Sequence, residues 1–175
     1  GFRLVPNTLT AEMLLDVFRR SERPFSRLHV EFQQRILEEA AAAGVARLLL
    51  ISGIGADPKS GSPYIRARGR GELVVQQAFP DATIVRPCAM FGPGDALFGT
   101  LADLARLLPA LPLIGGGRTR LQPVYVEDVA EAVARMLADA GTAGRTYELA
   151  GPGVYTMREL VKITLRLIGR RRLLV

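Results

Sequence analysis

Three residues have the types and spacing needed for proton transfer. Ser52 ends an apolar run of strand length, Tyr64 follows twelve residues later, and Arg68 lies four residues beyond Tyr64. Residues at i and i+4 share one face of a helix, so a cation at Arg68 would favour the ionised form of the phenol. Because tyrosine in water titrates at about pH 10, it needs such help to act as an acid or base near neutral pH. Ser52 could then hold a reacting oxygen.

The same residues also fit a purely structural interpretation. Tyr64 would then be a partly exposed helix residue, and Ser52 would be an ordinary strand end. Which groups these side chains can contact depends on the helices and strands that position them.

From about residue 29 onward, short β-rich apolar runs alternate with longer helical ones, which predicts an α/β fold around a mostly parallel sheet. The run over 47–52 is continuously apolar, as in a parallel strand buried on both faces. Gly69 and Gly71 are unfavourable inside a helix, which indicates close packing or a ligand there. The pattern predicts helices over 30–41, 63–78, 96–108, 127–137 and 156–169, strands over 47–52, 83–86, 121–126 and 145–150, and an irregular segment over 109–120.

The composition limits the class of protein. A chain of 175 residues with 49% hydrophobic residues is expected to form about one globular domain. Cys88 is the only cysteine and His29 the only histidine, so we expect no internal disulfide and no metal site. No apolar run reaches the roughly 20 residues that span a bilayer, so we expect no transmembrane segment. A reducing compartment follows, either the bacterial cytoplasm or the mitochondrial matrix side.

The net charge of +6 comes from 21 arginines and two lysines against 17 acidic residues. The basic residues concentrate at 66–70 and 170–172, and the others are mixed with acids along helical stretches. Because only 6% of the residues are aromatic, the stacking partners typical of nucleic-acid binding are scarce. We therefore expect no nucleic-acid partner.

Several motifs of nucleotide-binding and hydrolytic proteins are missing. The sequence has no GxGxxG after a first strand, no GxxxxGK phosphate loop and no GxSxG nucleophile elbow. The glycine runs at 92–94 and 115–117 do not lead into a phosphate-binding helix. P-loop and serine-hydrolase functions are therefore not expected.

The order of the remaining motifs resembles the extended and atypical short-chain dehydrogenase/reductases, which include NAD-dependent epimerases and dehydratases. Within them the chain looks like the group named after the nucleotide-binding accessory subunit of respiratory complex I and its bacterial relatives. The resemblance covers roughly residues 28–172, and its specificity lies in the combination of segments. The first segment is 28–31, which an alanine-rich helix follows. The others are 47–57, 64–72, 84–95, 121–130 and 147–152.

The resemblance implies roles for individual residues. Tyr64 takes the family's tyrosine position as the catalytic acid or base, and Arg68 takes the lysine position, which tunes the phenol and contacts the cofactor ribose. Ser52 lies where the family's serine positions the reacting oxygen and meets the cofactor, and His29 lies where asparagine is common. The other implied contacts are Pro87, Cys88, Ala89 and Met90 beside the nicotinamide, and Phe91, Gln122, Tyr125 and Asp128 on the substrate side.

Three of these residues also have structural alternatives. Asp128 could simply cap its helix, Tyr125 could be a core residue, and His29 could be a hydrogen-bonded residue at a helix start.

The sequence departs from the family pattern in two ways. Arginine at position 68 keeps the charge but is effectively never deprotonated, so it cannot relay a proton as lysine can. The glycine-rich phosphate cradle and the first strands are absent from the sequence, which weakens nucleotide binding. The expected fold is therefore the C-terminal portion of a Rossmann-like parallel sheet over 28–175, with parts of a small substrate lobe at about 88–126 and 145–175 and a poorly defined segment over 1–27.

Two functions remain open at this point. The first is an NAD(P)H-binding protein of oxidoreductase or epimerase/dehydratase ancestry, weakly catalytic or non-catalytic, with NADP or NAD as cofactor. The second is a non-enzymatic structural or assembly subunit of a respiratory NADH dehydrogenase-type complex. In that case a basic surface would dock onto a larger acidic or membrane-associated assembly.

Overall fold

A parallel sheet lies at the centre of the larger part of the molecule. The computed structural model describes residues 34, 36, 37, 39, 40 and 42–175, and within them three strands pair in the order β1-β2-β7. Leu50 pairs with Ile84, and Val85 pairs with Tyr147, all in parallel register. The bounds are Leu49–Ile51 for β1, Thr83–Pro87 for β2 and Thr146–Leu149 for β7.

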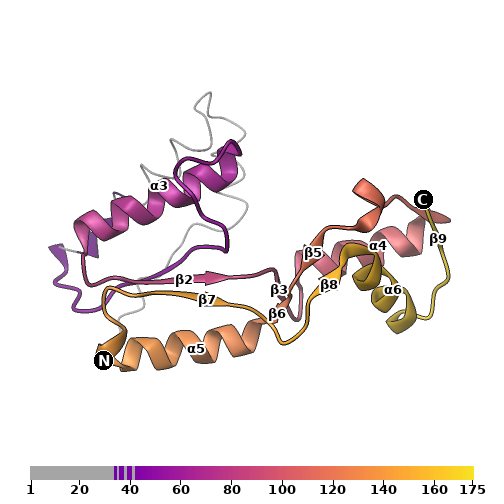
Figure 1. Ribbon diagram of the computed structural model, residues 1–175. Coiled ribbons are helices and arrows are strands. Elements are labelled where there is room, and N and C mark those ends of the chain that lie inside the picture. Colours follow the sequence, from indigo (N-terminus) through magenta and orange to yellow (C-terminus); the bar gives the residue numbers. More distant parts are fainter. Residues whose placement is uncertain (1–33, 35, 38, 41) are drawn as a thin grey trace.

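Among the helices that the structure describes in full, one covers each side of this sheet (Figure 1). They are α3, over Pro63–Ala78, and α5, over Val126–Ala138. Ile84 and Val85 in the central strand are completely buried between these layers. The arrangement confirms the expected α/β class with a parallel sheet.

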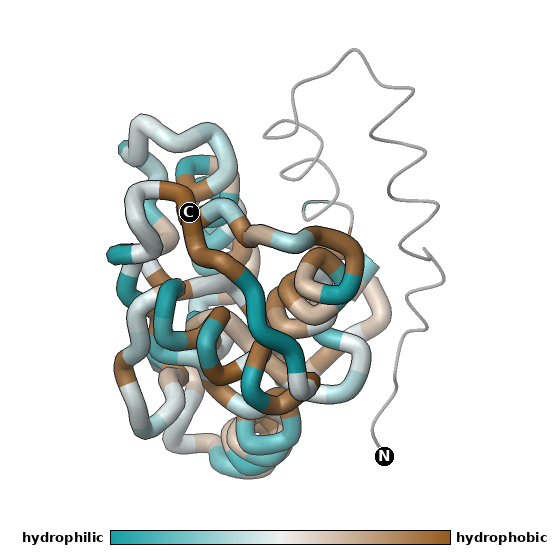
Figure 2. Tube along the Cα trace, turned by 90° about the vertical axis from the view of Figure 1, so that its right-hand side faces the viewer, coloured by the Kyte–Doolittle hydropathy of each residue, from teal (hydrophilic) through white to brown (hydrophobic). Residues whose placement is uncertain are grey.

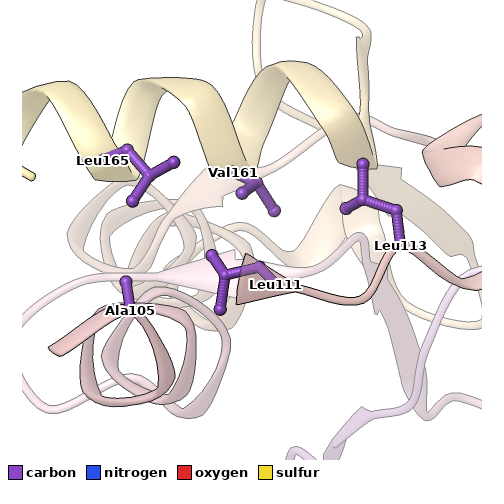
Figure 3. Packing of buried hydrophobic residues seen from close by; sticks show 5 residues of the cluster. All are labelled: Ala105, Leu111, Leu113, Val161 and Leu165. Atoms are coloured by element: carbon purple, nitrogen blue, oxygen red, sulfur yellow. The ribbon is translucent and has the colours of Figure 1, made fainter. Parts of the chain in front are cut away.

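A smaller lobe follows the carboxyl ends of the strands (Figure 1). Its core is formed by Ala105, Leu111, Leu113, Val161 and Leu165, which Figure 3 shows between two helices and a short strand. The elements in and around this lobe are α4 (Ala96–Leu107), α6 (Met157–Leu167), the 3-10 turn η1 (Ile114–Gly117), and the strands β3 (Met90–Phe91), β4 (Ala110–Leu111), β5 (Arg120–Leu121), β6 (Val124–Tyr125), β8 (Tyr155–Thr156) and β9 (Leu173–Leu174). A second 3-10 turn, η2 (Ala140–Thr142), connects α5 to β7.

The short strands tie distant parts of the chain together. The pairs are β3 with β6 and β4 with β9, both parallel, and β5 with β8, which is antiparallel. Figure 2 shows the end of the chain as an apolar segment preceded by a hydrophilic one, and these are residues 173–175 and 170–172. The apolar segment contributes β9, and Leu174 packs against the lobe core.

Helix α6 begins with the capping box that its sequence predicts. The Thr156 hydroxyl accepts a hydrogen bond from the Glu159 amide, and the Glu159 carboxylate accepts one from the Thr156 amide at 2.7 Å. These bonds satisfy two amide groups that a helix start would otherwise leave unpaired. The helix ends before Gly169, whose φ of +64° is the left-handed conformation typical of a C-terminal cap.

Helix α3 lies unusually close to the loop that precedes it. A Cβ atom at Gly69 would lie 2.3 Å from the backbone nitrogen of Pro58 and 2.4 Å from the carbonyl carbon of Asp57. Only glycine permits this approach, which confirms close packing as one reason for a glycine inside the helix.

An ion pair fixes α3 to the central strand. Arg86 donates to both carboxylate oxygens of Glu72, at 3.0 and 2.6 Å, and its guanidinium also lies 3.6 Å from Glu148 on β7. Glu72 is only 4% exposed, so its charge is compensated almost entirely by Arg86. These carboxylates raise the pKa of Arg86, and the hydrogen bond that Arg86 donates to Glu72 is the largest cause.

Three sequence predictions need correction. The run over 121–126 forms two strands, β5 and β6, because Pro123 has no amide hydrogen to continue a ladder. The segment over 109–120, expected to be irregular, contributes β4, which is held by residues near the end of the chain. Strand β1 is half-buried rather than buried on both faces, since in the described part of the sheet it pairs with β2 alone and Ile51 is 52% exposed.

The helix predicted over 30–41 is seen only in part. Residues 34, 36, 37, 39, 40 and 42 are helical, and Leu37 packs in a cluster with Val75 and Ala82. Gly44 follows with φ +63°, as expected for its cap.

Candidate functional site

The carboxyl edge of the parallel sheet brings most of the predicted site residues together. Hydrogen bonds continue past the strand ends, from the Ser52 amide to Val85 at 2.7 Å and from the Cys88 amide to Leu149 at 2.8 Å. Ser52 therefore follows β1 beside β2, and Cys88 follows β2 beside β7. In open α/β sheets this edge is where ligands bind.

Arg68 connects the first turns of α3 to this edge. Its guanidinium carbon lies 4.9 Å from the centroid of the Tyr64 ring. Its Nη1 atom would be 2.2 Å from a Cβ at Gly53, the residue directly after Ser52. The cation therefore lies between the tyrosine ring and the strand end, and the absence of a side chain at Gly53 makes the room for it.

Ser52 supplies a buried hydroxyl at the same place. The residue is 8% exposed, and among the described residues its Oγ atom has no hydrogen-bond partner. An unpaired buried hydroxyl costs about 1–3 kcal/mol, so such a group at a strand end marks a place where a ligand oxygen could bind.

The backbone over 87–90 forms a fixed wall beside these groups. The Pro87 carbonyl accepts from Ile54 at 3.2 Å, and the Ala89 carbonyl accepts from Val124 at 3.0 Å. Met90 begins β3 and pairs with Val124. These hydrogen bonds restrict the motion of the backbone over 87–90, which suits a surface against which a planar ring packs.

The Cys88 thiol lies in this wall. Partial burial raises its pKa, the negative charge of Glu148 adds to that shift, and a hydrogen bond with the Ala89 backbone opposes it. The neutral thiol is therefore the favoured form, which does not suit a nucleophile.

Phe91 and Tyr125, both predicted on the substrate side, lie in ring contact with centroids 5.4 Å apart. Phe98 meets Phe91 edge-on at 5.8 Å. These rings line a cavity of about 740 Å³ between α4 and α6, which we call the lobe cavity. Tyr125 is half-buried, and its ring both packs on Phe91 and borders this open space.

The remaining predicted residues are placed differently. The Gln122 side chain donates to the Gly151 carbonyl at 2.6 Å and so joins two loops. Asp128 is exposed in the first turn of α5, where a carboxylate interacts favourably with the helix dipole, and it does not line the lobe cavity. His29 lies outside the described residues.

Sequence reasoning missed the α6 wall of the lobe cavity. Val161 and Leu165 face the lobe core, whereas Ile163 and Leu167 face the cavity. The sequence signal that could have predicted this wall is the apolar stripe of α6, which is too wide to pack against a single core.

A basic groove of about 800 Å³ lies on another side of α6. Among the residues that the structure describes, no acidic side chain lines it. Its cationic residues are Arg158, Lys162, Arg166, Arg170, Arg171 and Arg172.

Two features are absent from the described part of the chain. No helix there is long and apolar enough to cross a membrane. No cluster there brings together three or more of the side chains that bind metals.

Comparison with known proteins assigns the class. The NAD dependent epimerase/dehydratase family matches residues 11–150, and the chain belongs to this family. A dTDP-glucose 4,6-dehydratase from Streptomyces venezuelae, solved with NAD bound, superposes with a TM-score of 0.72 at 27% identity. That match covers 86% of this chain and 54% of the dehydratase.

Two similar proteins carry different names. The NADH-ubiquinone oxidoreductase 40 kDa subunit of Neurospora crassa mitochondria is 39% identical over 148 residues, or 85% of this chain. A protein named ceramide reductase from Caulobacter vibrioides is 39% identical over 106 residues, or 61% of this chain. The chain spans only 38% and 33% of the lengths of these two relatives.

Proposed function

We propose that this chain forms the nicotinamide side of an NAD(P)(H)-binding protein of the short-chain dehydrogenase/reductase type. The observation that carries the proposal is the convergence of Arg68, the Tyr64 ring and the unpaired Ser52 hydroxyl at one sheet edge. A family of NAD-dependent enzymes and a structural relative with NAD bound support the same ligand class. NAD and NADP both remain candidates.

The residues present fit a nicotinamide riboside. Arg68 would donate to ribose hydroxyl groups, and the backbone over 87–90 would face the ring. The unpaired Ser52 hydroxyl would donate to the oxygen of a reacting carbonyl. Tyr64, which is 48% exposed, would exchange a proton with that oxygen. The nucleotide itself supplies or accepts hydride when bound.

Arg68 limits the catalysis that this site can perform. The guanidinium holds a positive charge beside the phenol, but it cannot lose a proton and therefore cannot pass one on to the ribose hydroxyl. We therefore propose slow turnover or none, with binding retained. The similarity to a protein named ceramide reductase supports a reductase ancestry.

Turnover by the intact protein tests the enzymatic version. NADPH oxidation is followed with a panel of aliphatic ketones, for the wild type and for Tyr64→Phe. A weak rate that falls about 100-fold or more in Tyr64→Phe, with unchanged NADPH affinity, supports general acid catalysis by the phenol. An equal rate in both proteins contradicts it.

A second candidate function is that of a structural subunit of a respiratory NADH dehydrogenase-type complex. The 40 kDa subunit relative favours it, and so does the basic groove beside α6, which could dock onto an acidic surface. The protein would then reside on the mitochondrial matrix side or in the bacterial cytoplasm.

Incorporation into the complex tests this candidate. Arg166→Glu/Arg170→Glu/Arg171→Glu removes the groove's net positive charge but keeps Arg172, which donates to the Ala105 carbonyl at 2.7 Å. We expect this variant to be lost from the assembled complex on native gels while its fold and NADPH binding persist. Normal incorporation would reject the groove as a docking surface.

A further inference from the structure

The walls of the lobe cavity are almost entirely apolar. Phe91, Phe98 and Tyr125 form the end nearest the sheet. Ile163 and Leu167 extend the lining along α6 toward the outside. The volume of about 740 Å³ is that of a typical small-molecule site.

The carboxylates and the hydroxyl in the lining mostly have partners within the protein. Asp95 accepts from the Phe98 amide at 2.6 Å and from the Gly92 amide at 3.4 Å, so it caps α4. The Thr164 hydroxyl donates to the Leu160 carbonyl at 2.9 Å. Few directed groups are therefore left for a polar ligand.

One tyrosine of the lining is held in its neutral form. The Glu127 carboxylate raises the pKa of Tyr125, through its charge and a hydrogen bond, so the phenol stays protonated. The other tyrosine is Tyr155, at the strand that leads into α6. The Tyr125 ring therefore supplies no charge that would hold a charged ligand.

The charges of the lining do not suit a phosphate. Its one cationic side chain within the described residues is Arg106, which is paired with Asp103 at 2.7 Å. Asp95 and Asp103 together outnumber this cation, so a sugar nucleotide would bring its diphosphate to a net acidic lining. An uncharged hydrocarbon meets no such penalty.

The lobe cavity reaches the surface at an apolar side chain as well as at the exposed Asp103–Arg106 pair. Leu167 lines it and is 80% exposed. An apolar side chain in contact with water gains free energy when a hydrocarbon covers it, so this end suits the far part of a long chain.

We infer that the lobe cavity binds the long, uncharged hydrocarbon chain of a lipid-like substrate, with the polar end of that substrate toward Phe91 and Tyr125. This inference rests on the proposed nicotinamide site, because it names the substrate class that would meet it. The orientation places the reactive end beside the sheet edge and the chain between α4 and α6.

Binding of a neutral NBD-labelled C12 acylglycerol to the intact protein tests the inference. We expect saturable binding, displaced by unlabelled acylglycerols that gain affinity about threefold to fourfold per added methylene. UDP-glucose should not displace the probe. Displacement by UDP-glucose, or affinities that do not depend on chain length, would overturn the inference.

A substitution that fills the cavity mouth provides the structural control. A Cβ at Gly99 on α4 meets no atom within 4 Å, so Gly99→Phe can enter the cavity without a backbone clash. We expect at least tenfold weaker probe binding. Ala134→Phe, on the exposed face of α5, adds the same ring elsewhere and should bind the probe like the wild type. Equal binding by Gly99→Phe and the wild type would also overturn the inference.

NADPH binding, measured in parallel without the lipid probe, separates the two proposals. Probe binding without NADPH binding rejects the nicotinamide site and leaves the lipid cavity standing. NADPH binding combined with UDP-glucose binding in the cavity rejects the lipid inference alone.

Discussion

The guanidinium carbon of Arg68 lies 4.9 Å from the centroid of the Tyr64 ring, on the side of α3 that faces the carboxyl ends of the strands. A cation at this distance from an aromatic face is attracted to it, which orders both side chains. The pair therefore faces the edge where ligands bind in α/β sheets, as the oxidoreductase interpretation requires.

Replacing Arg68 with lysine should raise catalysis rather than abolish it. Lysine keeps the positive charge but can also lose a proton, so it restores the relay that arginine lacks. We expect Arg68→Lys to oxidise NADPH with aliphatic ketones at least about tenfold faster than the wild type, at similar NADPH affinity. Steady-state kinetics with kcat and KM measured separately decide this. A slower Arg68→Lys enzyme would show that arginine is not the limiting group.

Glycines at two helix positions should respond oppositely to alanine. Gly69→Ala forces a Cβ to within 2.3 Å of the Pro58 backbone, and such overpacking costs about 1–3 kcal/mol of unfolding free energy. Gly99→Ala meets nothing within 4 Å and should stabilise the protein by up to about 1 kcal/mol through helix propensity. Urea denaturation of both variants measures the difference. Equal effects would contradict the close packing of α3 on the loop at 57–58.

Removing either partner of the ion pair between α3 and β2 should change the free energy of unfolding by different amounts. Arg86→Met leaves the buried Glu72 carboxylate without its cation, which we expect to cost about 3 kcal/mol. Glu72→Leu costs less, because Arg86 is partly exposed and keeps Glu148 at 3.6 Å. Chemical denaturation of the single and double variants provides the comparison. A larger loss of stability in Glu72→Leu than in Arg86→Met would show that the unpaired buried carboxylate is not the main cost.

Acid should weaken the start of α6 through Glu159. Its hydrogen bonds with Thr156 lower the pKa of this carboxyl below the usual glutamate value. Its contribution to stability is therefore complete above the unfolded-state pKa and is lost as the pH falls through the lower folded-state pKa. In urea denaturation at several pH values, the wild type should be more stable than Glu159→Gln at pH 7 and should lose that advantage as the pH falls below the usual glutamate pKa. A pH-independent difference would rule out the ionised cap.

Local sequence signals predicted much of the fold. Helix α3 was expected over 63–78 and is found at Pro63–Ala78, because its proline start and apolar spacing are local features. The capping box of Thr156 and Glu159 is equally local and is present. The order of strands and helices was enough to predict the parallel sheet.

Features that depend on distant contacts were not predictable in this way. Strand β4 exists because Ala110 and Leu111 pair with residues near the chain end, and no local pattern reports that pairing. The lobe cavity likewise requires α4 and α6 to lie apart at Phe98 and Ile163 while they pack at Ala105 and Leu165. For the site, the i, i+4 spacing predicted that Arg68 and Tyr64 meet, but not that Gly53 gives the guanidinium its place.

Titration of the intact protein with NADPH, followed by nucleotide fluorescence, tests the central claim most directly. Arg68→Met removes the cation at the sheet edge, and Arg70→Met removes an exposed cation from the same helix as a control. We predict saturable binding that weakens about tenfold or more in Arg68→Met and is unchanged in Arg70→Met, since a hydrogen bond from a charged group contributes about 1.5–3 kcal/mol. Equal affinity in Arg68→Met and the wild type would contradict a nicotinamide nucleotide at this edge.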